Sequence, residues 1–290
     1  MNQPQERTRL PSRRRMRAAE RAWTYGLMVA LSIVFLAPFA WMVSTSLKPS
    51  DQVVAGSPFK PPETLEWRNY ADVMRQAPFH VYFKNTAVVV ALSILGAVLS
   101  SSLCGYGFAR LRFPGRDKLF LFVLATMMLP PAVTLIPAFV IFRYLGWINT
   151  FKPLVLPFFF GVPFYIFLFR QFFRTIPRDL EDAAKIDGAT SFETFWRIMV
   201  PLSKPAVITV TIFTFVMVYN DFMGPLVYLN SESKWTVALG LASLQGALMY
   251  KTPWNFIMAA SVITLIPALL VFFASQRYLV EGIVTSGMKV

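Results

Sequence analysis

The sequence predicts an all-α membrane protein, a bundle of six transmembrane helices with one helix-turn-helix outside the bilayer. Three observations predict this class. The 290-residue chain is 56% hydrophobic and only 15% charged, which is more apolar side chain than one soluble core of this size buries. Six windows are long and apolar enough to cross a bilayer. A polar, helix-forming segment separates two of these windows in the second half of the chain.

The windows are runs of about 20 mostly apolar residues, the length that a helix needs to cross the hydrocarbon core. In chain order they are 23–45, 86–109, 118–142, 154–173, 205–222 and 254–275. The first two hold no charged residue. The third contains Pro130, Pro131 and Pro137. Because proline removes a backbone donor, this helix is predicted to be kinked or locally unwound.

The basic residues are distributed unevenly around these windows. With the N-terminus inside, 19 of the 28 Lys and Arg residues fall on the inner side. Cytoplasmic loops of membrane proteins carry such an excess, so both termini and the polar segment are predicted to be cytoplasmic. The formal charge of +13 is then explained without nucleic-acid binding. The predicted organisation is a basic tail, 1–22, a transmembrane domain, 23–276, and a cytoplasmic tail, 277–290.

The Arg-rich segment 1–22 is interpreted as a disordered tail that orients the chain, which explains its charge fully; contact with anionic membrane lipid is a second reading. The outer loop 46–85 is predicted to hold a short helix with Thr64 as its N-cap. This loop either receives a soluble partner or folds as a lid on its own helices, and the sequence leaves both readings open.

Cysteine and histidine are too few for most catalytic or metal chemistry. Cys104 is the single cysteine, and His80, the single histidine, has no carboxylate, thiol or second imidazole at a ligand-like spacing. We therefore expect no catalytic site, no metal and no cofactor in this chain. Ser101 and Gly105, around Cys104, have the small-xxx-small spacing of closely packed transmembrane helices.

The polar segment can be built from local rules. Pro177 suits the first turn of a helix, and three carboxylates follow it at the positive end of the helix dipole. Gly188 can take the left-handed conformation that ends this helix. Thr190 and Glu193 fit a capping box that starts a second helix, which the next proline stops. The segment 177–204 is therefore predicted to be a helix-turn-helix outside the membrane.

The surface of this helix-turn-helix has two readings. Ala183 and Ala184 would leave a shallow patch beside a carboxylate, and four apolar residues supply more surface than a short solvated loop needs. These four are Phe192, Phe195, Trp196 and Ile198. They either fill a groove of a partner protein or anchor the segment to its own transmembrane bundle.

The stretch "EDAAKIDGATSFETFWRIMVP" resembles the EAA loop of the permeases of type I ABC importers. That loop reads Glu-Ala-Ala, three residues, Gly, nine residues, Ile, one residue, Leu-Pro. Here the pattern falls on Asp182, Ala183, Ala184, Gly188, Ile198, Val200 and Pro201. Asp182 stands where the family has Glu, and Val200 where it has Leu. Stretches such as "FKNTAVVV" and "YNDFMGPL" are similar to the carbohydrate-uptake subgroup, on the side of the smaller maltose-type permeases, from about Ala22 to the C-terminus. Tyr219 departs from that pattern, which has Trp before Asn-Asp.

The resemblance implies a set of partners. In that family the loop is a coupling helix seated in a cleft of a cytoplasmic ATPase dimer, which binds the ATP and Mg; this chain has no G-x-x-x-x-G-K-[ST] phosphate loop. A second homologous permease, an extracytoplasmic solute-binding protein and a small-molecule substrate, a sugar, are also implied, in a bacterial inner membrane. The residues implied in ATPase coupling are Glu181, Asp182, Ala183, Ala184, Asp187, Gly188, Ile198 and Pro201.

Other residues are candidates for the translocation path or for a second ATPase contact. Carbonyls freed by Pro130 and Pro131 can line a midplane cavity, or these prolines only kink the helix. Asn220 and Asp221 either line the path or end the fifth helix in a turn with Gly224-Pro225. The C-terminal stretch "QRYLVEGIVTSGMKV" resembles a family tail that reaches the ATPase, and the matching residues are Gln276, Gly282 and Lys289.

Alternatives of other classes fit less well. The first alternative is a permease of the same kind for a solute other than a sugar, since the residues do not name the substrate. An ion-coupled secondary transporter needs buried carboxylates or paired charges, for which Asp221 is the one candidate. A membrane enzyme lacks a catalytic constellation, and a structural or receptor-like subunit gives no reason for the spacing of the helix-turn-helix.

Overall fold

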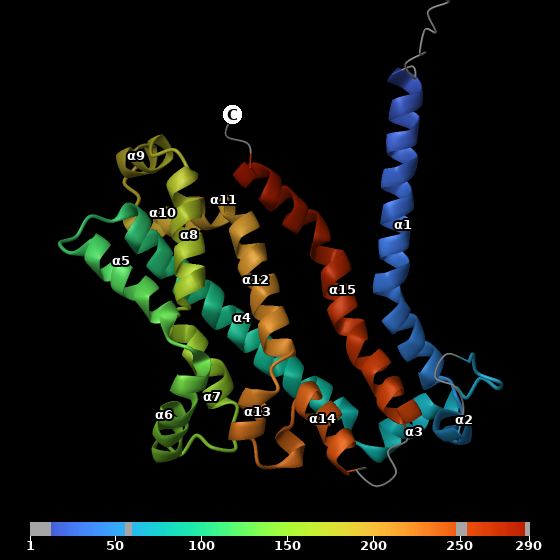
Figure 1. The fold of residues 1–290 in the computed structure, drawn as a ribbon. Helices are drawn as coiled ribbons and strands as arrows, with labels where there is room; N and C mark the ends of the chain where they lie inside the picture. Colours follow the sequence, from blue (N-terminus) through green and yellow to red (C-terminus); the bar gives the residue numbers. More distant parts are fainter. Residues whose placement is uncertain (1–12, 56–59, 248–253, 288–290) are drawn as a thin grey trace, which may run out of the picture. The chain divides into compact units, whose positions relative to one another are not determined.

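The computed structural model describes residues 13–55, 60–247 and 254–287. Within these ranges every regular element is a helix, which confirms the all-α class. The chain forms two compact units, residues 1–70 with 253–262 and residues 71–252 with 263–290. The predicted helix-turn-helix lies in the second unit (Figure 1).

Four helices of the described chain are long and apolar enough to cross a membrane: Glu20–Ser46, Phe79–Arg110, Lys152–Thr175 and Trp254–Gln276. Two bent pairs bring the number to six if each is one span. These are Arg116–Met128 with Pro131–Tyr144, bent by 97°, and Ser191–Leu202 with Lys204–Tyr219, bent by 77°. Each predicted window overlaps one of these helices or pairs, and the exact count of six spans stays a prediction.

The first unit contains α1 (Arg13–Ser46), α2 (Ser50–Ala55) and the start of α15 (Trp254–Gly287). Buried amides hold it together: Asn69 Nδ2 donates to the carbonyls of Ser46 and Lys48 at 2.8 and 3.0 Å. Asn255 Nδ2 donates to Asn69 Oδ1 at 3.1 Å. Such bonds satisfy polar groups that would be costly to bury alone.

Three boundaries near the chain ends and in the outer loop differ from the predictions. The basic tail, predicted as disordered over 1–22, is helical from Arg13, while residues 1–12 lie outside the described residues. Helix α3 (Arg68–Gln76) begins four residues after the predicted N-cap Thr64, and the N–H of Glu66, in the segment between them, donates to Leu47 O at 2.9 Å. Helix α15 continues through the predicted C-terminal tail to Gly287.

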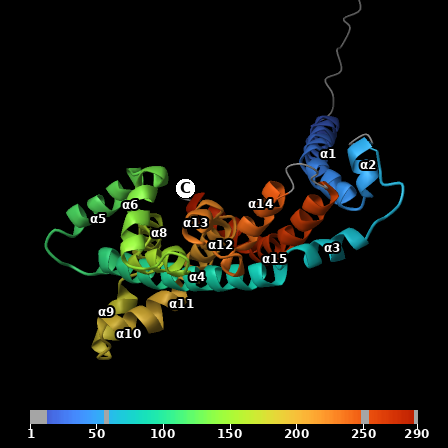
Figure 2. The same ribbon diagram turned by 90° about the horizontal axis from the view of Figure 1, so that it is seen from below.

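Helix α4 (Phe79–Arg110) is the central helix of the second unit, and it packs against α8 (Pro163–Thr175), α12 (Lys204–Tyr219) and α14 (Val237–Ala247) (Figure 2). The close approach of α4 and α8 depends on small residues, as predicted. A Cβ on Gly105 would lie 2.7 Å from Cβ of Phe169. The hydroxyl of the buried Ser101 accepts from the N–H of Val162 at 3.1 Å.

Proline breaks the third window, as predicted. Helix α5 (Arg116–Ala125) passes into a 3₁₀ turn, η1 (Thr126–Met128), and the chain restarts as α6 (Pro131–Tyr144). Pro130 is extended, with φ −63° and ψ 136°, because the residue before a proline avoids the helical region. Pro137 lies inside α6.

The fourth window is irregular in its first half, with α7 (Lys152–Val155) and the 3₁₀ helix η2 (Leu156–Phe160) before α8. After α12 come α13 (Met223–Tyr228), the 3₁₀ helix η4 (Glu232–Lys234) and α14, which the hydropathy pattern did not predict. Gly224-Pro225 therefore lies in the first turn of a short helix, α13, that follows a break after α12, rather than only in a turn.

Candidate functional site

The predicted helix-turn-helix is present and consists of α9 (Asp179–Ile186), α10 (Ser191–Thr194), the π-helical turn η3 (Phe195–Met199) and α11 (Val200–Leu202). We call residues 177–204 the hairpin. It lies at the end of α8 where that helix stops at Thr175 (Figure 1).

The first limb of the hairpin starts two residues after Pro177, with Arg178 as its N-cap. It ends in the motif in which a left-handed glycine closes a helix: Gly188 has φ +83° and its N–H donates to Lys185 O at 3.0 Å. The N–H of Ala189 donates to Ala184 O at 2.9 Å. These two bonds satisfy carbonyls at the helix end, so the predicted role of Gly188 as terminator is confirmed.

The second limb starts with the predicted capping box. Thr190 N donates to Glu193 Oε2 at 2.9 Å, and Glu193 N donates to Thr190 Oγ1 at 3.2 Å. The bond from the Thr190 backbone, followed by that from its hydroxyl, lowers the pKa of the exposed Glu193 carboxyl below its usual value. The limb ends at Leu202, one residue past Pro201, because proline is tolerated in the first turn of α11.

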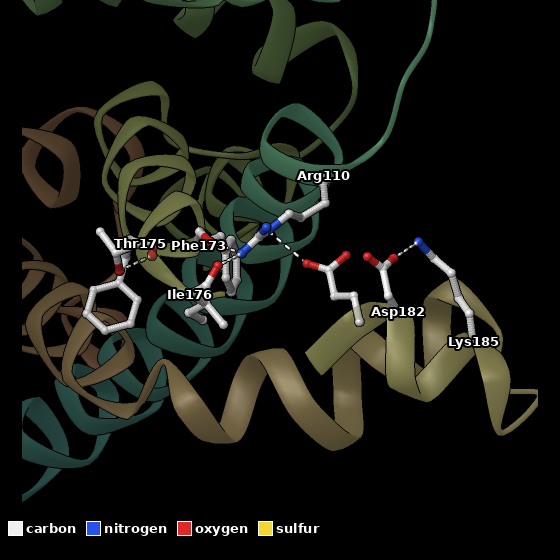
Figure 3. A network of polar contacts seen from close by, with 8 residues as sticks. Arg110, Phe173, Thr175, Ile176, Asp182 and Lys185 are labelled. Atoms are coloured by element: carbon white, nitrogen blue, oxygen red, sulfur yellow. Dashed lines mark hydrogen bonds and ion pairs between the residues drawn. The ribbon is translucent and has the colours of Figure 1, made fainter. Parts of the chain in front are cut away.

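One buried ion pair ties the hairpin to the transmembrane helices. Arg110 Nε lies 2.8 Å from Glu181 Oε1, with side chains 4% and 9% exposed, in an ion pair rather than a well-aligned hydrogen bond. The Arg110 Nη2 group also donates to the carbonyls of Phe173 and Ile176, at the end of α8 (Figure 3). Arg110 is the last residue of α4. One guanidinium therefore joins α4, α8 and α9.

The aromatic residues of the second limb divide between the two predicted readings. Phe195 is buried against Tyr106 and Phe173, with ring centroids 5.3 and 6.4 Å away. Phe192 is 62% exposed and contacts Trp196 edge to face at 6.2 Å, and Trp196 is also exposed. The limb is thus anchored on one side and presents aromatic surface on the other.

The first limb shows the same division. Ala184 and Glu181 are buried, whereas Asp182, Ala183 and Asp187 are exposed, because neighbouring positions of a helix point in different directions. The predicted patch of two exposed alanines is therefore wrong for Ala184. Asp182 pairs with Lys185 at 3.2 Å on the exposed side (Figure 3).

Of the remaining residues implied in coupling, Ile198 is half-buried and Pro201 is exposed. Ile186, which no pattern singled out, is 87% exposed beside the turn. Arg110 is the main residue that the sequence did not identify. Its position at the inner end of the second window was the only sequence feature that could have indicated it. Four basic residues share that region, and nothing in the spacing indicates which of them pairs with Glu181.

Of the four candidate residues of the translocation path, only Asn220 lines the cavity described next. A cavity of about 480 Å³ is lined by Asn220 with side chains of α8, α12 and α15, among them Phe164, Tyr165 and Phe272. Asn220 Nδ2 also donates to Val216 O at 2.8 Å. The carboxylate of Asp221 instead accepts from Gly224 N at 3.0 Å. The lining of this cavity does not include Pro130 or Pro131.

The candidate tail residues lie on or beyond α15. Gln276 is exposed on this helix, and Gly282 lies within its last turns. Lys289 lies outside the described residues.

Solved structures show the same fold. A bacterial ABC transporter involved in the import of the acidic polysaccharide alginate matches with a TM-score of 0.80 and 24% identity, over 93% of this chain and 99% of that chain. The bacterial alginate ABC transporter in complex with an alginate pentasaccharide-bound periplasmic protein matches with a TM-score of 0.61 and 17% identity, over 90% and 96% of the two chains.

Relatives match along most of the sequence. The diacetylchitobiose uptake system permease protein NgcG of Streptomyces coelicolor is 31% identical over 92% of this chain and 88% of its own length. The trehalose/maltose transport system permease protein MalG of Thermococcus litoralis is 34% identical over 90% and 94%. Residues 97–285, which include the hairpin, match the family model of the binding-protein-dependent transport system inner membrane component. The chain therefore belongs to the family of inner membrane components of binding-protein-dependent transport systems.

Proposed function

We propose that this chain is the permease subunit of an ATP-driven sugar importer and that its hairpin couples it to a cytoplasmic ATPase. The observation that carries the coupling role is the division of the hairpin into two sides. Glu181, Phe195 and Met199 fix one side to the chain's own helices, while Asp182, Phe192 and Trp196 are presented outward. A rigid, anchored element with exposed aromatic and acidic groups suits a groove in a partner protein.

The contacts between the hairpin and the transmembrane helices suit the transmission of movement from one to the other. Its first limb is joined to the end of α4 and the end of α8 through Arg110, and its second limb is joined to the same core through Phe195. A force on the exposed side therefore acts on two long helices without first deforming a loop. We propose that ATP and Mg are bound by the partner ATPase, and that closure of the ATPase dimer moves the hairpin.

A sugar is proposed as the substrate because relatives at 31% and 34% identity are permeases for diacetylchitobiose and for trehalose and maltose. The cavity of about 480 Å³ falls within the size range of small-molecule sites. Its aromatic lining suits the apolar faces of sugar rings, and Asn220 supplies donor and acceptor groups for hydroxyls. We therefore propose that Asn220 lines the translocation path. For Asp221, Pro130 and Pro131 a role in the path stays a prediction from the sequence.

The complete importer would contain a second homologous permease, an ATPase dimer and a solute-binding protein outside the membrane. A solved relative of this fold is in complex with a sugar-bound periplasmic protein, which supports the last of these partners. The proposed location is the bacterial inner membrane with both termini in the cytoplasm, and the excess of Lys and Arg on that side supports this orientation.

Uptake into vesicles tests this function. The reconstituted importer should take up sugar with ATP present and with proton and sodium gradients collapsed by ionophores. A secondary transporter would stop under these conditions, and such a stop would overturn the proposal. A panel of amino acids and peptides beside the sugars would show whether the substrate belongs to another class.

A further inference from the structure

A basic cavity beside the start of the hairpin has no role in the proposed coupling. It has a volume of about 470 Å³ and lies between the loop that joins α4 to α5 and the residue that precedes α9. Its charged lining consists of four cations and one carboxylate: Arg112, Arg116, Lys118, Arg178 and Asp117.

The single carboxylate is already engaged. Asp117 accepts from Arg116 through both oxygens, at 3.1 and 3.2 Å, and Arg170 Nη2 lies 3.6 Å away. Arg112, Lys118 and Arg178 are exposed and form no ion pair within the part of the chain that the structure describes. The cavity therefore has an excess of positive charge that the surrounding chain does not balance, and it suits an anion with several oxygens.

The position of the cavity along the chain indicates which anion. One candidate span ends at Arg110 and the next begins at Arg116, so the loop between them lies where two helices meet the membrane surface. A third candidate span ends at Thr175, three residues before Arg178. The cations are therefore expected at the depth of the lipid headgroups.

Apolar side chains continue directly from the cations. Leu119, Leu121 and Phe122 follow Lys118 on α5, and all three are exposed in the described chain. A surface with cations at the interface and apolar side chains next to them matches a phospholipid, with its phosphate and its acyl chains. An acidic protein surface would leave the apolar part exposed.

We propose that this cavity binds the phosphate of an anionic phospholipid. The bound headgroup would also steady the start of the hairpin, because the carbonyl of Arg178 accepts the N–H groups of Glu181 and Asp182 at 2.9 and 3.0 Å. A lipid would thus contact the element proposed to couple transport to ATP hydrolysis, without being part of that coupling.

Lipid retained by the purified full-length chain tests the site independently of transport. The variant Arg112→Gln/Lys118→Gln removes two cations without removing an internal ion pair, and Lys84→Gln/Arg143→Gln is the control, since these exposed residues lie at the far ends of α4 and α6. Binding of phosphatidylglycerol, measured by native mass spectrometry, should fall about fivefold for each cation removed from the cavity. It should stay near the wild-type level in the control.

Three outcomes would overturn the proposal. Equal loss in the cavity variant and the control would show that the cations act only through general surface charge. Displacement of phosphatidylglycerol by soluble glycerol phosphate, at a concentration comparable with the lipid, would show that a free phosphate is the ligand. Wild-type retention of lipid, with loss of the ATPase on co-purification, would assign the cations to the ATPase surface instead.

Discussion

The guanidinium of Arg110 and the carboxylate of Glu181 meet at 2.8 Å between Nε and Oε1, and both side chains are buried. The same guanidinium donates to two carbonyls at the end of α8. A single residue therefore joins the hairpin to two long helices. Because a buried charge without its partner is costly, neither residue is expected to tolerate loss of the other.

Glu181→Ala is expected to release the first limb of the hairpin from α4. Leaving Arg110 buried without a counter-charge costs about 3 to 5 kcal/mol, which the chain avoids by opening this contact. Limited proteolysis should cut the hairpin faster in this variant, and ATP hydrolysis by the reconstituted importer should no longer depend on substrate. Glu63→Gln, which removes the exposed pair with Lys60, is the control. A rate of hairpin cleavage in Glu181→Ala equal to that of the wild type would contradict the anchoring role.

Thr190→Ala should destabilise the second limb by about 1 kcal/mol, since it removes the N-cap of α10. The amide N–H of Glu193 donates to Thr190 Oγ1, so its hydrogen exchange should become faster when this acceptor is removed. The neighbouring change Ser191→Ala leaves the box intact and is the control. Equal exchange rates in the two variants would show that the box contributes nothing to the start of this helix.

The capping box should also respond to pH. The pKa of Glu193 is lowered in the folded chain, so its contribution is present above the unfolded value of about 4.3 and is lost as the pH falls through the lower folded value. Exchange at the Glu193 amide, corrected for intrinsic rates, should therefore stay slow at neutral and mildly acidic pH. Loss of protection already near pH 6 would contradict this assignment.

Gly188→Val should strain the turn of the hairpin. A Cβ on Gly188 would meet no other atom within 4 Å, so the cost comes from the backbone φ of +83°. For a residue with a side chain this conformation costs about 1 to 2 kcal/mol, and for a β-branched one more, whereas Asn tolerates it. Uptake should fall with Val and be largely kept with Asn, while both variants remain in the membrane. Equal uptake by the two variants would contradict the prediction.

Gly105→Ala should weaken the contact between α4 and α8, because the new Cβ would lie 2.7 Å from Cβ of Phe169 and 3.1 Å from the backbone N of Arg170. Overpacking of this kind costs about 1 to 3 kcal/mol. Gly107→Ala is a matched control on the same helix, since its Cβ would meet nothing within 4 Å. The thermal unfolding temperature in detergent should fall for Gly105→Ala alone. Because Ala is a better helix former than Gly, the control should unfold at the wild-type temperature or above it, and a similar decrease in both variants would contradict the overpacking at Gly105.

Local rules predicted the hairpin well because its ends depend on neighbouring residues. The left-handed Gly188, the box of Thr190 and Glu193 and the break at Pro130 each require only a few consecutive residues. The N-cap predicted at Thr64 was wrong, since α3 begins at Arg68; the N–H of Glu66 bonds to Leu47 O, a contact between separate segments that local rules do not include.

Which side of the hairpin faces inward could not be predicted in this way. Phe192 and Phe195 are equally apolar, and only the packing of Phe195 against Tyr106 separates them. Glu181 and Asp182 are adjacent carboxylates, and only the position of Arg110 makes one internal and the other exposed. These differences arise from contacts between distant segments, which periodicity and spacing do not specify.

The proposed contact with the ATPase is tested most directly by cysteine labelling of the hairpin. In a Cys104→Ser background, single changes Ile186→Cys and Phe192→Cys place thiols at two exposed positions, and Glu63→Cys is an exposed control outside the hairpin. A water-soluble maleimide is applied to the detergent-purified importer with and without its ATPase, so that positions on both sides of the membrane are reached, and the labelling rates are compared. The ATPase should slow labelling at Ile186→Cys and Phe192→Cys and leave Glu63→Cys unchanged. Labelling at the hairpin positions that is unchanged by the bound ATPase would contradict the coupling role.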